Sequence, residues 1–89
     1  MRTPVYAKRF EKDLKLMIKR GYDPEIIKSI VRTLIEEIPL ERKHRDHILI
    51  GNFKDRRECH IEPDWLLVYR IEGNMIVFER TGTHADLFW

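Results

Sequence analysis

The chain has 89 residues, enough for one domain with one modest core, so we expect a single domain over residues 1–89. Its 43% hydrophobic and 36% charged residues are typical of a soluble globular protein, and no apolar run approaches the roughly 18 residues of a membrane span. Residues 1–4 lack the apolar segment of a signal peptide, and the lone Cys59 excludes an internal disulfide. We therefore expect a cytoplasmic protein without a membrane partner.

Charge is unevenly distributed along the chain, although the net charge is only +2. Between Arg2 and Arg20, seven basic residues stand against two acidic ones. A second basic cluster lies further on and contains Arg42, Lys43, Arg45, Lys54, Arg56 and Arg57. A chain polarised in this way can present a basic face to a polyanion, although a solvated helix face would explain the first cluster equally well.

Two helices are predicted in the first half of the chain. Apolar residues spaced three and four apart predict an amphipathic helix over residues 7–20: Phe10, Leu14, Met17 and Ile18. Gly21 is expected to end this helix in a left-handed conformation, and Asp23 is a suitable N-cap for the next one. The second apolar stripe continues to Ile38, where Pro39 ends it. The short link between the helices predicts antiparallel neighbours.

Strands are predicted on both sides of the helices. Residues 2–6 are short and β-prone, and Pro4 restricts them to an edge strand or a lead-in. Residues 40–55 lack a clear period and predict an exposed, charged connection with a short strand at 48–50. Three further strands are predicted at residues 56–61, 65–71 and 75–80, with turn residues between them and a tail that folds back on the sheet.

The predicted fold class is therefore α+β, in the order β-α-α-β-β-β, with a small antiparallel sheet and a helix hairpin covering one face. If each turn has three residues, His60 lies opposite Leu66, and Leu66 lies opposite Arg80. His60 and Arg80 would then share one cross-strand row on one face of the sheet. A change of one residue in either turn would undo this register.

Histidine is the side chain that can both give and take a proton near neutral pH. The chain has four of them: His44, His47, His60 and His84. Three have a carboxylate close by in the sequence, which suits a shared site with acid and base groups. Scattered surface histidines would give the same pattern, so spacing alone leaves both interpretations open.

A metal site and a cysteine nucleophile have weaker support. His44 and His47 are three residues apart and Cys59-His60 could add ligands, but structural zinc sites usually have two closely spaced ligand pairs. We therefore expect no metal and no cofactor. Neighbours in a strand point to opposite faces, so Cys59 and His60 do not suit a nucleophile–base pair, and Cys59 is expected to be a small core residue.

Three segments carry a specific combination of residues. Their patterns are D-H-x-L-x-G-x-[WF]-K at residues 46–54, R-[DE]-x-H-x-x-P-D at 57–64 and R-x-G-[ST]-H-x-x-L-F at 80–88. Each pattern alone is weak, but together they resemble the YafQ branch of the RelE superfamily of bacterial toxins, over most of the chain. One departure is Phe53, where a tryptophan is common in that family.

This resemblance implies a RelE-like fold and the toxin half of a type II toxin–antitoxin pair, an endoribonuclease that cuts mRNA in the ribosomal A site. It also implies a cognate antitoxin, mRNA and ribosomal RNA as partners. By position in the family's motifs, we expect the catalytic residues to be His47, His60, Asp64, Arg80 and His84. The residues that we expect to bind RNA are Trp65, Phe88, Lys54 and Arg57.

Such a set can cleave RNA without a metal. A base takes the proton of the 2′-hydroxyl, an acid gives a proton to the departing 5′-oxygen, and fixed positive charge stabilises the phosphate intermediate. We expect His84 and Asp64 to transfer the protons and Arg80 to supply the charge. The other two catalytic histidines would orient or stabilise the phosphate, and the two aromatic residues would stack on a base.

Each assignment has a structural alternative. Trp65 and Phe88 could be core residues, and Arg80 could form only a surface ion pair. Asp64 could be only a turn residue after Pro63. For the whole protein, the alternatives are a non-catalytic RNA- or protein-binding module on the same scaffold and, with less support, a metal-dependent hydrolase.

Overall fold

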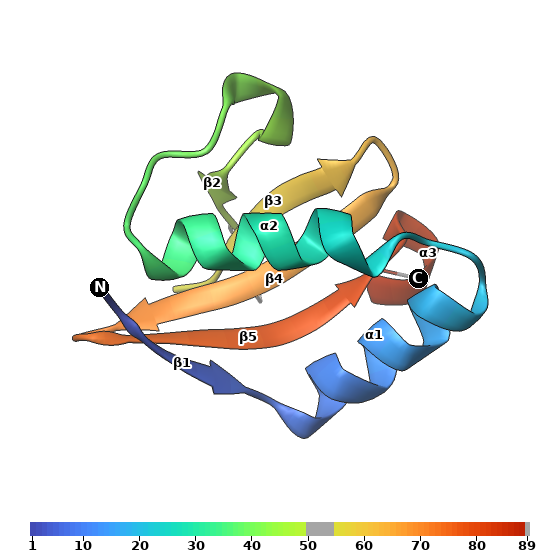
Figure 1. Ribbon diagram of the computed structural model, residues 1–89, viewed down its shortest axis with the longest axis horizontal. Helices are drawn as coiled ribbons and strands as arrows, with labels where there is room; N and C mark the ends of the chain where they lie inside the picture. Colours follow the sequence, from blue (N-terminus) through green and yellow to red (C-terminus); the bar gives the residue numbers. More distant parts are fainter. Residues whose placement is uncertain (50–54, 89) are drawn as a thin grey trace.

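The computed structural model describes residues 1–49 and 55–88. In chain order its elements are β1 (Thr3–Tyr6), α1 (Lys8–Lys19), α2 (Pro24–Ile35), the 3₁₀ helix η1 (Arg42–His44), β2 (His47–Ile48), β3 (Arg57–Glu62), β4 (Trp65–Glu72), β5 (Met75–Gly82) and α3 (His84–Phe88). The predicted α+β class and β-α-α-β-β-β order are confirmed, with η1 and α3 in addition and β2 near the predicted short strand (Figure 1). The predicted strand at 48–50 begins one residue earlier, and residue 50 lies outside the described residues.

The strands form one five-stranded sheet in the order β1-β5-β4-β3-β2. β1 pairs in parallel with β5, whereas the other neighbouring strands are antiparallel. β1 is therefore an edge strand, where Pro4 is tolerated as predicted. β1 pairs only with Met75 to Phe78, so α1 can approach the second half of β5 along the same edge.

Helix α1 forms close to its predicted bounds. Its buried side chains are Phe10 and Met17, whereas Ile18, expected in the buried stripe, is 43% exposed. Gly21 follows with φ 99°, the left-handed conformation that was predicted to end the helix.

Helix α2 begins as predicted but ends earlier. Asp23 caps it, accepting a hydrogen bond from the Glu25 N–H at 2.9 Å. The helix ends at Ile35 and not at Ile38, because Glu37 adopts φ 62° and turns the chain out of the helix. From their short link the two helices diverge, α1 lying along β5 and α2 against β3, so they do not pack side by side over their whole lengths as the predicted hairpin would (Figure 1).

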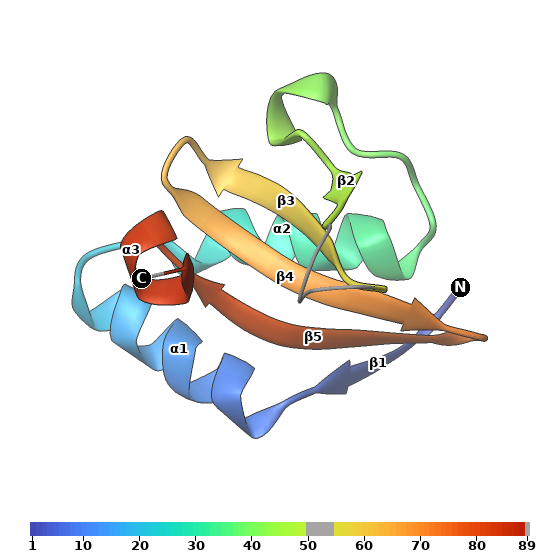
Figure 2. The same ribbon diagram turned by 180° about the vertical axis from the view of Figure 1, so that it is seen from behind.

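The core lies between one face of the sheet and the two helices. It contains Phe10, Met17, Ile27, Ile30, Leu34, Cys59, Ile61, Trp65, Leu67, Tyr69, Ile76 and Phe78. Cys59 is fully buried, as predicted for a small core residue. The opposite face, seen in front in Figure 2, carries the alternate residues of β3 and β4, including Glu58 and His60. Within the described residues, the structure has no helix of the length and apolarity needed to cross a membrane.

The register of β5 differs from the prediction. His60 does lie opposite Leu66, but Leu66 lies opposite Gly82, and Arg80 lies opposite Val68. The turn between β4 and β5 has two residues instead of three, and a β-bulge at Glu79 shifts the pairing again. The bulge breaks the alternation, so that Arg80 leaves the core-facing row and Thr81, 1% exposed, takes its place in the interior.

Candidate active site

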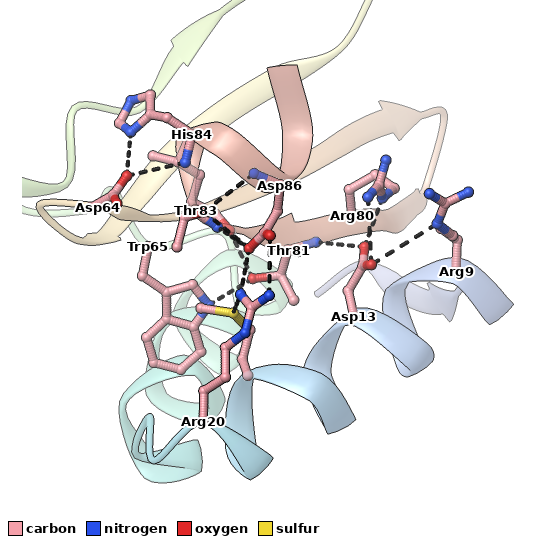
Figure 3. A network of polar contacts seen from close by, with 12 residues as sticks. Arg9, Asp13, Arg20, Asp64, Trp65, Arg80, Thr81, Thr83, His84 and Asp86 are labelled. Atoms are coloured by element: carbon pink, nitrogen blue, oxygen red, sulfur yellow. Dashed lines mark hydrogen bonds and ion pairs between the residues drawn. The ribbon is translucent and has the colours of Figure 1, made fainter. Parts of the chain in front are cut away.

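Asp64 and His84 form a hydrogen-bonded pair between two different elements (Figure 3). Asp64 lies in the β3–β4 turn and His84 is the first residue of α3. Asp64 Oδ1 accepts hydrogen bonds from Nδ1 of His84 at 2.6 Å and from its backbone N–H at 3.0 Å. The backbone hydrogen bond and then the ring lower the pKa of Asp64, so the charged carboxylate accepts the ring proton. Nε2 of His84 is then the ring nitrogen left for a substrate.

A second carboxylate fixes the start of α3. Asp86 Oδ2 accepts the backbone N–H of Thr83 at 2.9 Å, and the Thr83 hydroxyl accepts the backbone N–H of Asp86 at 3.2 Å. Arg20, at the end of α1, donates to both oxygens of Asp86, at 2.7 and 3.3 Å. The hydrogen bonds from Arg20 and Thr83 lower the pKa of Asp86 to about 2. Helix α3, and His84 with it, is therefore tied to α1.

Two more histidines are connected to this pair on the face of the sheet opposite the helices. The ring centroid of His60 lies 5.7 Å from that of His84. Glu58 Oε1 lies 3.5 Å from Nε2 of His60 and 3.6 Å from Nε2 of His47, which is opposite Glu58 on β2. The Glu58 side chain is only 8% exposed, so a buried carboxylate joins the two imidazoles.

A cavity of about 740 Å³ lies beside these histidines. His60 and His84 line it from one side, and Lys43 and Arg45 line it from the segment around η1. His44 also lines it and is held in place, because its Nδ1 donates to the carbonyl oxygen of His60 at 2.7 Å. The size of the cavity and its imidazoles and cations suit a ligand that carries a phosphate.

Arg80 belongs to the same face but not to the same row as His60. Its row runs across four strands, through Val68 and Glu58 to His47. The expected row shared with His60 is wrong, because the β4–β5 turn has two residues and the bulge shifts the pairing once more. Arg80 lines a separate cavity of about 200 Å³. Its Nε donates to Asp13 of α1 at 2.6 Å, so the ion pair considered as its structural alternative is present.

The two aromatic candidates differ in burial. Trp65 is 0% exposed, lies edge-on to Tyr22 and donates its indole N–H to the Thr81 hydroxyl at 2.9 Å. The prediction that Trp65 stacks on an RNA base is therefore wrong for this structure, because a buried indole presents no face to a ligand, and its core alternative is confirmed. Phe88, at the end of α3, is 38% exposed, so a contact with a base stays a prediction.

The remaining RNA-binding candidates are not brought to the histidines. Arg57 lies on the helix-covered side of β3, where its Nε donates to Asp46 and to the hydroxyl of Tyr69, each at 3.3 Å. It lines another cavity, which the histidines do not reach. Lys54 lies outside the described residues.

The ligand set considered for a metal does not assemble in the part of the chain that the structure describes. Cys59 points into the core while His60 points to the opposite face. Burial also raises the pKa of the Cys59 thiol, which disfavours the thiolate that would bind a metal. Among residues 1–49 and 55–88, no three histidine, cysteine or acidic side chains are grouped so that they could hold a metal ion.

Sequence reasoning missed three contributors to the site: Glu58, Asp13 and the pair of Arg20 with Asp86. Glu58 had a local signal, because it precedes His60 by two residues and so shares its face of the strand. Asp13 and Arg20 had none, because their partners lie in β5 and α3, at the other end of the chain.

Comparison with known proteins gives a consistent result. Residues 2–89 match the family model described as a bacterial toxin of type II toxin-antitoxin system, YafQ. The mRNA interferase toxin YafQ of Escherichia coli K12 is 43% identical over 84 residues, which are 93% of this chain and 91% of the relative.

Solved structures agree with the sequence match. A chain in the crystal structure of the E. coli DinJ-YafQ complex is 41% identical, with a TM-score of 0.93 and 100% of both chains covered. A copper-bound mutant toxin from Helicobacter pylori is 35% identical, with a TM-score of 0.94, over 99% of this chain and 100% of the other.

Proposed function

Because this chain belongs to the YafQ family of bacterial type II toxins, we propose that it is an mRNA interferase, an endoribonuclease that cuts mRNA in the A site of the ribosome. The observation that carries this proposal is the His84–Asp64 pair, next to His60 and beside a cavity lined by cations. A cut that uses the 2′-hydroxyl of the RNA needs a base, an acid and fixed positive charge, and these groups are all near the cavity.

The proposed reaction forms a bond between the 2′-oxygen and the neighbouring phosphorus and breaks the bond from phosphorus to the 5′-oxygen. A base takes the 2′-hydroxyl proton, and an acid gives a proton to the 5′-oxygen, which leaves a 2′,3′-cyclic phosphate. We assign one transfer to Nε2 of His84 and the other to His60, whose ring is 5.7 Å away. Each such step contributes roughly 10²–10⁴-fold to the rate.

Asp64 has a different role in this proposal from the one that its sequence position suggested. Its Oδ1 is already engaged by the ring and backbone of His84. We therefore assign it the fixing of the His84 tautomer and the stabilisation of the imidazolium, rather than proton transfer to RNA. Arg80 would hold the phosphate, His47 would support His60 through Glu58, and Phe88 would contact a base.

Two partners follow from the same proposal. The basic residues of α1 and of the η1 segment would bind ribosomal RNA through its phosphates, a contact that weakens with salt and does not depend on sequence. A cognate antitoxin would cover the cationic site, in the cytoplasm where ribosomes are translating; the E. coli relative has been solved in a complex with DinJ.

Cleavage of a translated mRNA, followed by primer extension, tests the proposal. The wild type should cut within the reading frame, and His84→Gln should lower the rate roughly 10²-fold or more. Lys28→Gln is a suitable control, because Lys28 is exposed on α2 and pairs only with Glu25 among the described residues. Absence of cutting by the wild type, with intact binding to ribosomes, would instead favour the non-catalytic binding module.

A metal-dependent hydrolase is the second candidate, because a toxin from H. pylori that is 44% identical has been solved with bound metal. The proposed reaction needs only the protein's own acid and base groups. We therefore expect equal cleavage rates with and without EDTA, provided that both reactions keep enough free magnesium for the ribosomes to stay intact. A rate that falls on chelation and returns with one added transition metal would favour the hydrolase.

A further inference from the structure

Asp13 of α1 contacts two adjacent residues of β5, Arg80 and Thr81 (Figure 3). Its Oδ2 accepts hydrogen bonds from Nε of Arg80 at 2.6 Å and from the backbone N–H of Thr81 at 3.2 Å. Its Oδ1 accepts from Nη2 of Arg80 at 3.4 Å and lies 3.9 Å from Nε of Arg9. One carboxylate therefore holds both the Arg80 side chain and the backbone that follows it.

The fold makes this contact possible. β1 pairs with β5 only as far as Phe78, and further along this edge Asp13 accepts the Thr81 N–H as the next strand residue would. The bulge at Glu79 turns Arg80 out of the core-facing row. The side chain of Asp13 is 13% exposed and that of Arg80 is 27%, so solvent screens this pair less than it screens an ordinary surface ion pair.

The geometry leaves part of the guanidinium available. Its five N–H groups lie in one plane, and Asp13 engages the one on Nε and one on Nη2. The other three point away from Asp13, in an arrangement that suits a phosphate. We propose that Asp13 is a positioning residue that fixes Arg80 so that its outer edge meets the phosphate of the RNA. This inference rests on the proposed function, in which Arg80 binds that phosphate.

Asp13→Asn separates positioning from simple folding. The amide keeps the size of the side chain and an acceptor for the Thr81 N–H, but it loses the charge that holds Arg80. We expect the single-turnover cleavage rate on ribosomes to fall roughly ten- to hundredfold. The toxin concentration at half-maximal rate should change less than about threefold, since the mRNA and ribosome contacts are kept. In an Arg80→Ala background, Asp13→Asn should cause no further loss.

The matched control is Glu11→Gln, which removes the same charge from an exposed position of the same helix and should cleave at the wild-type rate. Equal rates for the Asp13 and Glu11 variants would overturn the inference. A further loss of rate when Asp13→Asn is added to Arg80→Ala would also overturn it.

The Nε–H signal of Arg80 in NMR gives a readout that does not need cleavage. Its order parameter should be high in the wild type and in Glu11→Gln, and lower in Asp13→Asn. Equal order parameters in all three proteins would overturn the positioning role. If Arg80 loosens in Asp13→Asn while the wild type does not cleave at all, the positioning contact stands and the proposed ribonuclease function fails.

Discussion

Nδ1 of His84 lies 2.6 Å from Oδ1 of Asp64, across the space between α3 and the β3–β4 turn. The same oxygen accepts the backbone N–H of His84, so the ring and the first turn of α3 are held by one atom. Rotation of the imidazole would break the shorter of these hydrogen bonds. Nε2 is therefore kept as the nitrogen that a substrate can reach.

We expect Asp64→Asn to lower the cleavage rate roughly tenfold or more at pH 7, because the amide cannot stabilise an imidazolium at His84. Because His84 lowers the pKa of Asp64, the carboxylate that accepts this hydrogen bond is fully charged above the ordinary carboxyl pKa of about 4, and its contribution is lost as the pH falls through the lowered pKa. In ¹⁵N NMR, Nδ1 of His84 should be protonated in the wild type near neutral pH.

Asp55→Asn is the control for this variant, because Asp55 is exposed and its φ of 68° is a conformation that asparagine adopts readily. It should cleave like the wild type. A wild-type rate for Asp64→Asn as well would contradict the role assigned to Asp64.

We expect Arg20→Gln to lower the unfolding free energy, because it removes the partner of Asp86. The pKa of Asp86 is about 2 in the folded state, against an ordinary value of 3.8. Its charge therefore stabilises the fold above about pH 4, and this contribution is lost as the pH falls towards 2. Since the Asp86 side chain is 26% exposed, we expect a loss of only about 1 kcal/mol in unfolding free energy at pH 7.

Urea unfolding at several pH values checks this expectation. The difference between wild type and Arg20→Gln should shrink as the solution becomes acidic, whereas Lys19→Gln, an exposed neighbour, should leave the curve close to that of the wild type. A difference that stays constant down to pH 2 would show that Asp86 is not the group responsible.

We expect Trp65→Phe to lower the stability of the fold rather than to remove a contact with RNA. The substitution removes the hydrogen bond to Thr81 and leaves space in the core, so we expect a loss of about 1–3 kcal/mol in unfolding free energy. Thr81→Val removes the same hydrogen bond from the other side, together with the one that the Thr81 hydroxyl donates to the Leu66 carbonyl oxygen. A double-mutant cycle should show that the losses at Trp65 and Thr81 are not additive. An unchanged unfolding midpoint together with lost cleavage would restore Trp65 as an RNA contact.

Cys59 should not react with thiol reagents in the native protein. It is fully buried, and burial raises the pKa of its thiol, so little thiolate forms near neutral pH. Labelling with a disulfide reagent at pH 8 should be slow in buffer and immediate in denaturing urea. Fast labelling of the native protein would show that the β3–α2 packing opens readily.

The order of elements could be predicted because it depends on local patterns. The helix-forming stripes, the Asp23 cap and the alternating strands are all encoded by neighbouring residues. The end of α2 could not be predicted in this way, because the apolar spacing continues to Ile38 while the left-handed conformation of Glu37 turns the chain away. The bulge at Glu79 was also hidden, because two charged residues in succession give no sign of which one faces the core.

The same distinction applies to the candidate site. Asp64 and His84 were both named from motifs. They come together because the β3–β4 turn, which contains Asp64, lies near the end of β5, which His84 follows. Their mutual hydrogen bond, which is the reason for the role that we propose for Asp64, depends on where α3 begins. The burial of Trp65 depends on the shared core and on the Tyr22 ring, which no local pattern connects to it.

The parallel pairing of β1 with β5 has a consequence for how the chain folds. Thr3 lies opposite Met75, so their contact closes a loop that contains both long helices and three strands. Closing such a long loop costs conformational entropy before the β1–β5 pairing stabilises the chain. In contrast, β3, β4 and β5 form an antiparallel meander joined by tight turns. Folding should therefore nucleate in this meander, and the N-terminal strand should be the last to join the sheet.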